Sequence, residues 1–568
     1  MNRTIVEVAM EIAYSPDALR SISAKFGPDA VQACAMSNSV GGIGPLLRER
    51  IPALAKAGAS IAGVSLLYEN VWVQDFYLWG QIYIQKIKVG DMIRGVLSDP
   101  GISFDLEMPD GRACPVKVWK TDLSGAPVYL LDSPGVSDVV YPGPEDAPED
   151  HPNPDAWVTE HKLRQYWLAG RGTLALLKAL DLRPGLIVQS ETPAFFANHF
   201  LVTDAFQKDP FFKDTRYVFN DHTPLEYAHP FWNESDTLRA RVDPRYARDK
   251  KFWNAERRGV DVTRLLIGVS DATYGVSRKH GQVMRAMPSL KGLEEKIGSI
   301  TNGVSVPFWR DPSFEGFEGL SDAELIERKE KRKAEMVLWL WKKYRLWVDW
   351  RSKVKGKCFV NWTRRVTTYK RFDVLEALLK NPALKKRFLE TDIVLLIGGR
   401  IHQNDDLSQN VMFTLLDLVT TQAELRDRII VLNNYNVWIA PEIFRGIDAS
   451  IMLADDGREA SATGFMKAQV NGAAVVASPD GAVPESVRFA GPGVPAEEVN
   501  GFEVPYVHGR PEPQGLLAAL EELDRATRDP AARARMVRAS FRASGAVSVD
   551  RMAGEMIKLF NYVSSKKA

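Results

Sequence analysis

The second half of the chain repeats one pattern, a short apolar run followed by a helix-like segment. The apolar runs cover residues 357–362, 393–397, 428–433, 449–454 and 473–478. Each run is apolar along most of its length rather than at alternate positions, which is typical of a strand buried on both faces. Strands that alternate with helices in this way form parallel sheets with a helix layer on each side. The pattern therefore predicts an α/β fold with a doubly wound parallel sheet.

The first half alternates strand-like and helix-like segments less regularly. The sequence predicts strands over residues 5–13, 61–67, 185–190 and 215–220, a hairpin over 112–131, and mostly helix over 263–287. Residues 307–320 resemble a linker, and Ser321 with Glu324 has the capping-box spacing that opens a long amphipathic helix. We expect two doubly wound, Rossmann-like domains, residues 1–302 and 303–568, that face a central cleft. The last helix of the chain could pack on the first domain, as in enzymes of the GT-B type.

The charge balance excludes a strongly basic or acidic protein. The 568 residues include 73 Lys+Arg and 72 Asp+Glu, a net charge of +1, so no overall field favours nucleic acid or an anionic membrane. Three scattered cysteines without C-x-x-C spacing argue against a disulfide framework or a zinc site. The first residues are unlike a signal peptide, and no run approaches about 20 apolar residues. These features predict a cytoplasmic protein without a nucleic-acid or membrane partner.

Lys467 stands in the segment that follows the fourth apolar run, E-A-S-A-T-G-F-M-K. A strand, a turn of small residues and a helix start present unpaired backbone N–H groups, which favour a bound anion. The apolar neighbours Phe465, Met466 and Ala468 would weaken the preference of the lysine for its charged form, as a nucleophilic or Schiff-base amine requires. The alternative is an ordinary lysine on an amphipathic helix. A second acidic turn one strand later, at Asp480, favours a functional site.

Polar residues follow most of the predicted strands. Because ligands of open parallel sheets bind outside the carboxyl ends of the strands, these positions predict a site. In the second half they are Arg364, Arg365, residues 398–399, Tyr435, Glu459 and Asp480. In the first half they are the glycine-rich turn 41–44, Glu191, His222 and Asn302.

Four cations and a tyrosine occupy residues 364–371, R-R-V-T-T-Y-K-R. A solvated helix start is the ordinary explanation of such a run. Its place directly after a buried strand, with two threonines in the turn, favours oxyanion binding instead.

Together these segments resemble the glycogen (α-glucan, maltodextrin) phosphorylases, in a short form like those of bacteria and archaea. E-A-S-A-T-G-F-M-K is similar to the family segment E-A-S-G-T-G-x-M-K, which carries pyridoxal 5'-phosphate on its lysine, with Ala462 in place of a glycine. Residues 364–371 resemble K-R-x-x-x-Y-K-R, with Arg364 in place of the first lysine. The turn 41–44, F-N-D-H-T-P around His222, T-N-G around Asn302 and N-N-Y-N-V around Tyr435 are similar to further motifs of the family.

The resemblance implies a role for each matching residue. Lys467 would carry the aldehyde of the cofactor, and the other cofactor-binding residues would be Arg364, Lys370, Thr463, Gly464 and Tyr435. Arg365 would hold inorganic phosphate or the phosphate of glucose 1-phosphate. The sugar would contact the backbone of Gly42 and Ile43, His222 near the anomeric carbon, Asn302 at O6, and Glu459 with Ser461 at the 3-hydroxyl. The catalytic set would be Lys467, Arg365, Lys370 and His222, without a metal.

The implied activity is retaining phosphorolysis of an α-1,4-glucan or maltodextrin to α-glucose 1-phosphate, with the cofactor phosphate as a proton relay. Two alternatives stay open: a GT-B glucosyltransferase of the glycogen-synthase type that uses a nucleotide sugar, and a non-catalytic glucan-binding relative. Pro193 and Tyr274 stand where the family has a histidine and an asparagine, which leaves the sugar open. A homodimer is compatible with the family. The regulatory extension of the animal enzymes has no room before Ile5, so we expect no control of that kind.

Overall fold

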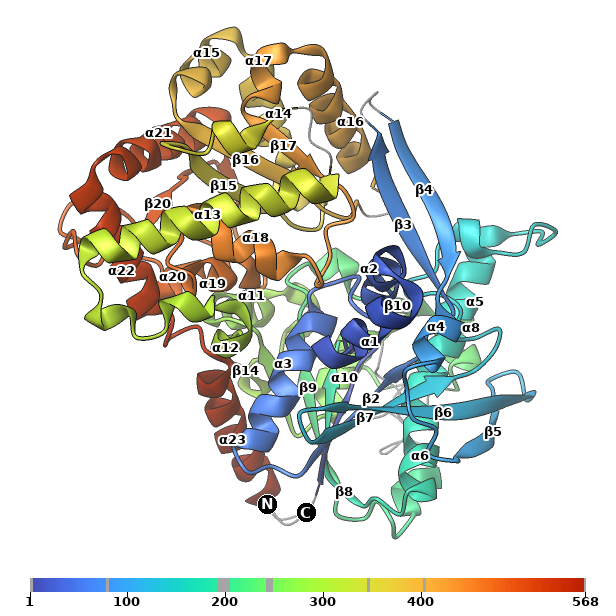
Figure 1. Cartoon of the computed structure of the whole chain (residues 1–568). Helices are drawn as coiled ribbons and strands as arrows, with labels where there is room; N and C mark the ends of the chain where they lie inside the picture. Colours follow the sequence, from blue (N-terminus) through green and yellow to red (C-terminus); the bar gives the residue numbers. More distant parts are fainter. Residues whose placement is uncertain are drawn as a thin grey trace. The chain divides into compact units, whose positions relative to one another are not determined.

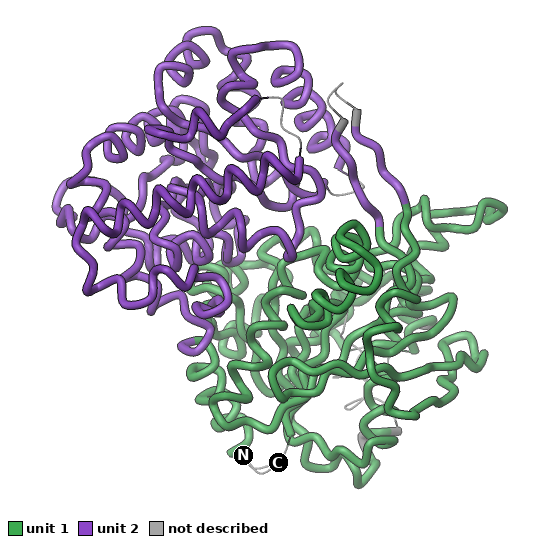
Figure 2. The backbone as a smooth tube through the Cα atoms, in the orientation of Figure 1, with its two compact units in different colours: residues 1–71, 86–301, 552–568 green, residues 72–85, 302–551 purple. Residues whose placement is uncertain are grey.

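The computed structural model describes residues 4–77, 81–191, 205–241, 249–344, 348–401 and 405–565. The chain forms two compact units, coloured separately in Figure 2. The first contains residues 1–71, 86–301 and 552–568, and the second contains residues 72–85 and 302–551. Asn302, which the predicted boundary put in the first domain, is therefore part of the second unit. Pro193 lies outside the described residues.

The first unit is built on a nine-stranded sheet with the order β14-β13-β9-β8-β1-β2-β7-β6-β5 (Figure 1). Its strands are β1 (Thr4–Val8), β2 (Ile61–Leu66), β5 (Ser103–Glu107), β6 (Ala113–Leu123), β7 (Ala126–Asp132), β8 (Pro184–Ser190), β9 (Arg216–Asn220), β13 (Ala272–Gly275) and β14 (Ile297–Ser299). Pairing is parallel from β14 to β7 and antiparallel from β7 to β5. The pair β6–β7 confirms the predicted hairpin.

The larger helices of the first unit surround this sheet. They are α1 (Pro16–Phe26), α2 (Pro28–Ser37), α3 (Ile43–Lys56), α4 (Gly90–Arg94), α5 (Pro154–Trp167), α6 (Thr173–Ala179), α8 (Glu234–Arg239), α10 (Val262–Val269), α11 (Arg278–Ala286) and α23 (Val549–Ser565), the last of which begins in the second unit. A small sheet is formed by β10 (Phe231–Asn233), β12 (Gly259–Asp261) and β11 (Trp253–Asn254).

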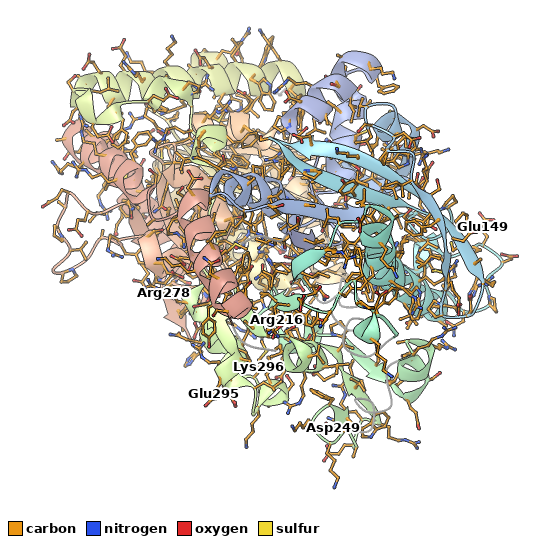
Figure 3. The ribbon with its side chains drawn as sticks, turned by 90° about the horizontal axis from the view of Figure 1, so that it is seen from below. Glu149, Arg216, Asp249, Arg278, Glu295 and Lys296 are labelled. Atoms are coloured by element: carbon orange, nitrogen blue, oxygen red, sulfur yellow. The ribbon has the colours of Figure 1, made fainter. Side chains whose placement is uncertain are left out.

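The prediction of mostly helix over residues 263–287 is wrong in its middle. The strand β13 separates α10 from α11, because Ala272–Gly275 pairs with β9 on one side and β14 on the other. A strand of four residues is too short to be told from a helix by its apolar period. Lys296, labelled in Figure 3, donates from Nζ to the carbonyls of Gly268 at 2.7 Å and Ser270 at 3.0 Å, which satisfies the end of α10.

The second unit contains the predicted parallel sheet, with the order β17-β16-β15-β18-β19-β20. Its strands are β15 (Cys358–Thr363), β16 (Ile393–Gly398), β17 (Ile429–Leu432), β18 (Ala449–Met452), β19 (Ala474–Ala477) and β20 (Gly501–Glu503), all paired in parallel. The first five confirm the five apolar runs of the sequence, and β20 was not predicted.

Alternate residues of these strands enter two separate cores. Val360 and Trp362 pack with α14 (Phe372–Lys380), α16 (Asp406–Thr421) and α21 (Pro513–Arg528). Phe359, directly before Val360 in sequence, packs with α13 (Asp322–Tyr344), α18 (Ala440–Gly446) and α19 (Thr463–Gln469). Figure 1 shows α13 running across the sheet. Both faces of the sheet are therefore covered, as the continuous apolar runs predicted.

The remaining elements of the second unit are short or lie at its edges. They are α12 (Val306–Trp309), α15 (Pro382–Glu390), α17 (Ala423–Arg426), α20 (Val483–Ser486), α22 (Pro530–Ala543), β21 (Tyr506–Val507) and β22 (Arg510–Pro511). The strands β3 (Asn70–Tyr77) and β4 (Gln81–Lys88) form a separate two-stranded sheet.

Residues 307–320 are not the linker that the sequence predicted. Trp309 and Phe314 are fully buried and Phe317 nearly so, because this segment packs against α13 and α22. The capping box after it is confirmed, since Ser321 N donates to Glu324 Oε2 at 2.8 Å and Glu324 N to Ser321 Oγ at 3.3 Å.

A buried carboxylate, Asp448, joins α13, α22 and the sheet. Its Oδ2 accepts from Phe359 N at 2.9 Å and lies 3.0 Å from Lys333 Nζ, and its Oδ1 accepts from Arg533 Nη2 at 3.0 Å. Burial alone would raise the pKa of this carboxyl, but the charges of Lys333, Arg533 and Lys329 hold it below its ordinary value. The group is therefore ionised in the folded protein.

Replacement of Asp448 should destabilise the second unit strongly. Asp448→Asn removes the buried counter-charge of Lys333 and Arg533, which keep only the less buried carboxylate of Glu330, and we expect the free energy of unfolding to fall by about 3 kcal/mol. Urea denaturation measures it. The exposed pair of Asp427 with Lys353, 2.8 Å apart, supplies the control, because Asp427→Asn should change the free energy of unfolding by less than about 1 kcal/mol.

The stability that Asp448 provides should also depend on pH. Since folding lowers the pKa of Asp448, its contribution to the free energy of unfolding is present above the ordinary aspartate pKa of about 3.9 and is lost as the pH falls through the pKa of the folded state. Equal effects of the two substitutions would contradict this account.

Candidate functional site

The turn after β15 carries the predicted basic residues. Arg364 donates from Nη1 to the carbonyl of Leu453 at 3.1 Å and pairs through Nη2 with Glu459. Lys370 is buried, and its Nζ lies 2.8 Å from Glu459 Oε2. Arg365 is exposed. The structure thus brings Arg364, Lys370 and Glu459 together and leaves Arg365 toward solvent.

The Glu459 carboxylate is the centre of this cluster. Burial would raise its pKa, but the adjacent charges of Arg364 and Lys370 lower the pKa to about 2. Both cations contact Oε2, so Oε1 is the oxygen that can accept from a hydroxyl group. Glu459 is therefore an ionised acceptor at neutral pH.

Tyr369 is the tyrosine of the basic run, and the sequence analysis gave it no role in the site. Its phenol lies close to the same cations. Its ring centroid lies 4.7 Å from Lys370 Nζ. Burial would raise the pKa of a phenol, yet the charges of Lys370, Arg365 and Arg364 lower the pKa of Tyr369 below its ordinary value. The turn thus presents an electropositive surface that also favours other anions. The tyrosine of R-R-V-T-T-Y-K-R was the available signal.

Asp480 holds the turn that carries Glu459. Its carboxylate accepts from the backbone N–H groups of Gly457 at 3.1 Å, Arg458 at 2.9 Å and Glu459 at 2.8 Å. The second acidic turn is therefore a structural support for the first. It fixes the backbone from which the Glu459 side chain projects.

Small residues follow Glu459. The Ser461 hydroxyl is buried and has no hydrogen-bond partner within the described part of the chain, which is an uncommon state that a bound polar group would relieve. Thr463 and Gly464 open α19, and a Cβ on Gly464 would lie 2.4 Å from Met452 Cε, so a larger residue there would displace the end of the methionine side chain.

Lys467 lies on α19 and is half-buried, while Phe465, Met466 and Ala468 around it are fully buried. Its Nζ is 4.4 Å from the centroid of the Trp309 ring. An aromatic face attracts an ammonium group. The apolar neighbours are as predicted, but the surroundings of the amine include an aromatic ring that the sequence analysis assigned to a linker.

Tyr435 follows β17 and is half-buried. Burial raises the pKa of its phenol to about 12, while a hydrogen bond with Thr363 at the end of β15 acts in the opposite direction. Tyr435 therefore lies beside the strand that leads into the basic turn, and stays a neutral hydrogen-bonding group.

In the first unit, the glycine-rich turn 41–44 is held by Glu11. Glu11 accepts from Gly41 N at 3.0 Å and from the Tyr141 hydroxyl at 2.6 Å. A Cβ on Gly44 would lie 2.2 Å from the carbonyl oxygen of Asn38, so this close approach needs glycine. Gly42 caps α3, whose first residue is Ile43. The predicted pair thus lies at the start of a helix of 14 residues.

His222 is joined to a buried polar network. Asn220 Oδ1 accepts from Arg50 Nη1 at 2.7 Å and lies 2.7 Å from His222 Nε2, while Asn220 Nδ2 donates to the carbonyl of Tyr274 at 3.1 Å. His222 Nε2 is therefore the donor, and Nδ1 is left as an acceptor. Burial and the charge of Arg50 lower the pKa of His222 to about 3, so the ring is neutral at physiological pH.

A second group of titratable residues lies beside His222 and was not predicted. Asp221 Oδ2 is 3.5 Å from His229 Nε2 and 3.8 Å from His280 Nε2, and all three side chains are buried. Although burial would lower the pKa of His229, Asp221 raises it to about 9. Tyr274 is also buried, with its hydroxyl 3.4 Å from Arg50 Nη1. Asn302 is buried, and its carbonyl accepts from Arg551 at 2.9 Å.

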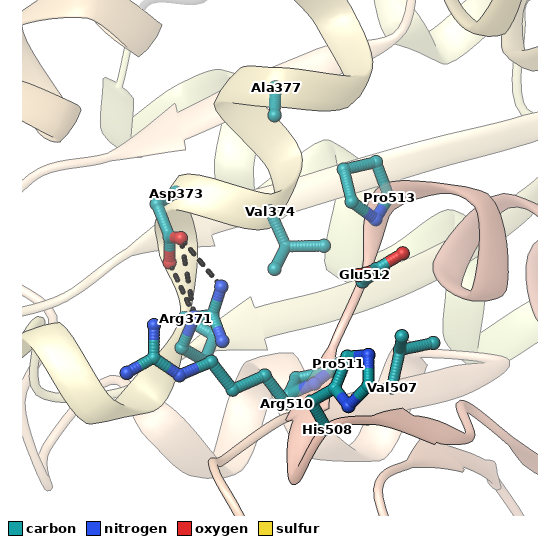
Figure 4. Close-up of a pocket in the computed structure, with 10 residues that line it drawn as sticks. All are labelled: Arg371, Asp373, Val374, Ala377, Val507, His508, Arg510, Pro511, Glu512 and Pro513. Carbon is teal, nitrogen blue, oxygen red and sulfur yellow. Dashed lines mark hydrogen bonds and ion pairs between the residues drawn. The ribbon is translucent and has the colours of Figure 1, made fainter.

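A cavity of about 620 Å³ lies next to the basic turn in the second unit. Figure 4 shows Arg371, Asp373 and Val374 of the α14 region opposite His508 and Arg510 of the β21–β22 hairpin. Arg371 pairs with Asp373 at 2.8 Å and with Asp455 at 2.7 Å. The lining of this cavity does not include Arg364, Lys370, Glu459 or Lys467, so it is distinct from the cluster.

No helix among the described residues is both long and apolar enough to span a membrane. No group of three or more His, Cys, Asp or Glu side chains in the same residues is placed to hold a metal ion.

Two family models match the chain. Residues 320–493 match the carbohydrate phosphorylase model, and residues 32–297 match the starch synthase catalytic domain. Maltodextrin phosphorylase of Thermococcus litoralis is 23% identical over 495 residues, which cover 76% of this chain and 57% of that protein. Glycogen phosphorylase of Mycobacterium tuberculosis is 22% identical over 551 residues, which cover 82% and 61%. The chain thus spans about three-fifths of the length of these relatives.

Among solved structures, the catalytic domain of starch synthase IV from Arabidopsis thaliana, bound to ADP and acarbose, has a TM-score of 0.73 at 16% identity, over 99% of both chains. This likeness confirms the GT-B type of α/β fold. The chain thus has the GT-B fold and is similar to the carbohydrate phosphorylases, with the family model matching residues 320–493.

Proposed function

We propose that the chain is an α-glucan phosphorylase that converts an α-1,4-glucan or maltodextrin and inorganic phosphate to α-glucose 1-phosphate, with pyridoxal 5'-phosphate on Lys467. The observation that carries this proposal is the buried cluster in which Arg364 and Lys370, from the turn after β15, contact Glu459 on the segment that leads to Lys467. It lies inside the segment that matches the phosphorylase model.

The residues around Lys467 fit a cofactor with a phosphate group. Arg364 and Lys370 would hold that phosphate, the buried Ser461 hydroxyl lacks a partner among the described residues, and the Trp309 ring offers an aromatic face beside the lysine amine. When bound, pyridoxal phosphate would supply a phosphate group able to exchange a proton with the substrate phosphate.

Arg365 and Glu459 would handle the substrates. Arg365 is the exposed cation of the turn, so its guanidinium is the group able to bind inorganic phosphate in two-point contact. Glu459 is ionised, and its Oε1 would accept from a sugar hydroxyl. His222 would accept from a sugar hydroxyl through Nδ1, because Nε2 already donates to Asn220.

A second candidate is a glucosyltransferase that uses a nucleotide sugar. The match of residues 32–297 to the starch synthase domain favours it, and the structural neighbour with that fold binds ADP. Such an enzyme needs no cofactor on Lys467, so the two candidates differ in a directly measurable property. A non-catalytic relative would lack both activities.

The reaction itself gives the decisive test. Purified protein with maltodextrin and inorganic phosphate should release α-glucose 1-phosphate without a nucleotide sugar or a divalent metal. Borohydride reduction and peptide mapping should locate pyridoxal phosphate on Lys467. Glucose transfer from a nucleotide sugar only, with Lys467 unmodified, would support the second candidate. Phosphorolysis of another α-glucoside would keep the mechanism and change the substrate.

Arg365→Ala should weaken the use of phosphate while the cofactor stays bound. Loss of a charge-assisted two-point contact should lower kcat/KM for phosphate by about 2–4 kcal/mol of transition-state binding, roughly 30- to 1000-fold. Initial rates at varied phosphate measure this, and absorbance of the cofactor monitors its content. Arg510→Ala, an exposed arginine of the neighbouring cavity, is the control. Unchanged phosphate saturation would exclude Arg365 from this role.

Ala462, the departure from the family motif, adopts the conformation that glycine favours. Its φ is 65° and ψ 49°, in the left-handed region, while its methyl group packs in the core. The turn therefore has the shape expected of the glycine-containing motif despite the substitution. A left-handed alanine costs about 1–2 kcal/mol, whereas burial of one methyl group contributes about 0.8 kcal/mol.

Ala462→Gly should consequently leave the free energy of unfolding nearly unchanged, within about 1 kcal/mol, because the two terms oppose each other. Ala468→Gly is the matched control, since Ala468 is fully buried inside α19. At Ala468 the loss of the buried methyl group and the low helix propensity of glycine both destabilise the protein, and we expect the free energy of unfolding to fall by about 1.5–2 kcal/mol. Thermal denaturation distinguishes the two. An equal loss in both variants would show that the left-handed backbone is not strained by alanine.

A further inference from the structure

The strands β3 and β4 belong to a hairpin whose residues 72–85 form part of the second unit, although the rest of that unit begins at residue 302 (Figure 2). Gln74 and Phe76 on β3 are 5% and 6% exposed. Phe76 packs in the core that contains Trp362, Val366 and Ile401, and Ile82 on β4 packs against the same core. We name residues 72–85 the arm. The arm is thus built into the side of the second unit on which the basic turn lies.

Two carboxamide side chains fasten the arm to the loops that follow β16 and β17. Gln74 Nε2 donates to the carbonyl of Ile401 at 2.9 Å, and Ile401 N donates to Gln74 Oε1 at 2.8 Å. In the second fastening the loop supplies the side chain and the arm supplies the backbone. Phe76 N donates to Asn433 Oδ1, and Asn433 Nδ2 donates to the Phe76 carbonyl at 3.0 Å. Each pair reproduces the two bonds that opposite residues exchange in an antiparallel sheet. Both loops are therefore held in defined positions.

The loop held by Gln74 is in register with the basic turn. Arg364 N donates to the Gly398 carbonyl at 3.0 Å, and Val366 N donates to the Arg400 carbonyl at 2.8 Å. Val366 and Ile401 form a parallel bridge. A Cβ on Gly399 would lie 1.7 Å from the Arg364 carbonyl oxygen, so the two backbones are in closest contact here. The backbone on both sides of Arg365 is therefore fixed by residues 398–401.

The second fastening lies beside Tyr435. Asn434, which adopts a left-handed φ of 49°, donates from Nδ2 to Asp75 Oδ1 at 2.5 Å. The arm therefore reaches the loops on which both Arg365 and Tyr435 depend, through different residues.

We infer that the arm positions the phosphate-binding turn, with Gln74 as the positioning residue for Arg365. This inference rests on the proposed function, because it takes Arg365 as the ligand of the substrate phosphate. Gln74 does not contact phosphate. It acts through Ile401 and Val366 on the backbone of Arg365.

Gln74→Met tests the inference, because methionine keeps the length of the side chain and removes both hydrogen bonds. We expect the KM for phosphate to rise about tenfold with little change in kcat or cofactor content, since small displacements of a positioned group weaken binding steeply. Hydrogen exchange should accelerate at the amides of Ile401 and Val366. Gln85→Met is the control, because it makes the same substitution on β4, at a side chain that takes part in neither of the two fastenings described above.

A second variant keeps the test decisive if Gln74→Met does not fold. Gln74→Glu retains an acceptor for Ile401 N and loses the donor to its carbonyl, so a smaller rise of the same constant is expected. If the wild type carries out phosphorolysis and the Gln74 variants equal Gln85→Met, only this inference is overturned. If the wild type shows no phosphorolysis, the proposed function fails, and the role of Gln74 fails with it. A fall in kcat with unchanged KM for phosphate would also reject the positioning role.

Discussion

Burial of both faces of the second sheet confines its polar chemistry to the strand ends. Val360 and Trp362 enter one core and Phe359 the other, so no position within β15 is free to carry a charge. The candidate groups consequently stand where the strands end. Arg364 and Arg365 follow β15, Tyr435 follows β17, Glu459 follows β18 and Asp480 follows β19. Parallel strands bring these ends to one edge, which is why residues distant in sequence meet in one cluster.

Supports beneath the cluster are as important as the residues that would touch a ligand. Asp480 orients the backbone of Glu459 through three N–H groups, and residues 398–401 hold the backbone of Arg364 and Val366. Preorganised groups of this kind do not have to reorganise when a charged ligand binds. The low pKa of Glu459 and the lowered pKa of Tyr369 have one cause, the cations of the same turn.

The sequence predicts those parts whose signal is local. Continuous apolar runs identified five of the six parallel strands of the second unit, and the motif segments identified Arg364, Lys370 and Glu459, which the structure brings together. Trp309, Phe314 and Phe317 were missed because they are buried by contacts with α13 and α22 rather than by a periodic pattern. The four residues of β13 are strand only because two neighbours pair with them. The arm has an alternating pattern in Q-I-Y-I-Q-K-I-K, but the partners of Gln74 lie more than 300 residues away and leave no local trace.

The charges of the cluster bear on how two phosphate groups would share the site. Within the cluster, Arg364 and Lys370 are opposed by the ionised Glu459, which leaves one positive charge. A phosphate monoester carries about 1.5–2 negative charges at neutral pH. The cluster therefore does not balance two dianionic phosphates, and Arg371 is already paired with Asp373 and Asp455. A second phosphate would bind more favourably with a proton, and that proton would lie between the two groups. Under the proposed function, the cofactor phosphate and the substrate phosphate would therefore share a proton. This shortage of positive charge would favour proton exchange between them over the binding of two fully ionised phosphates.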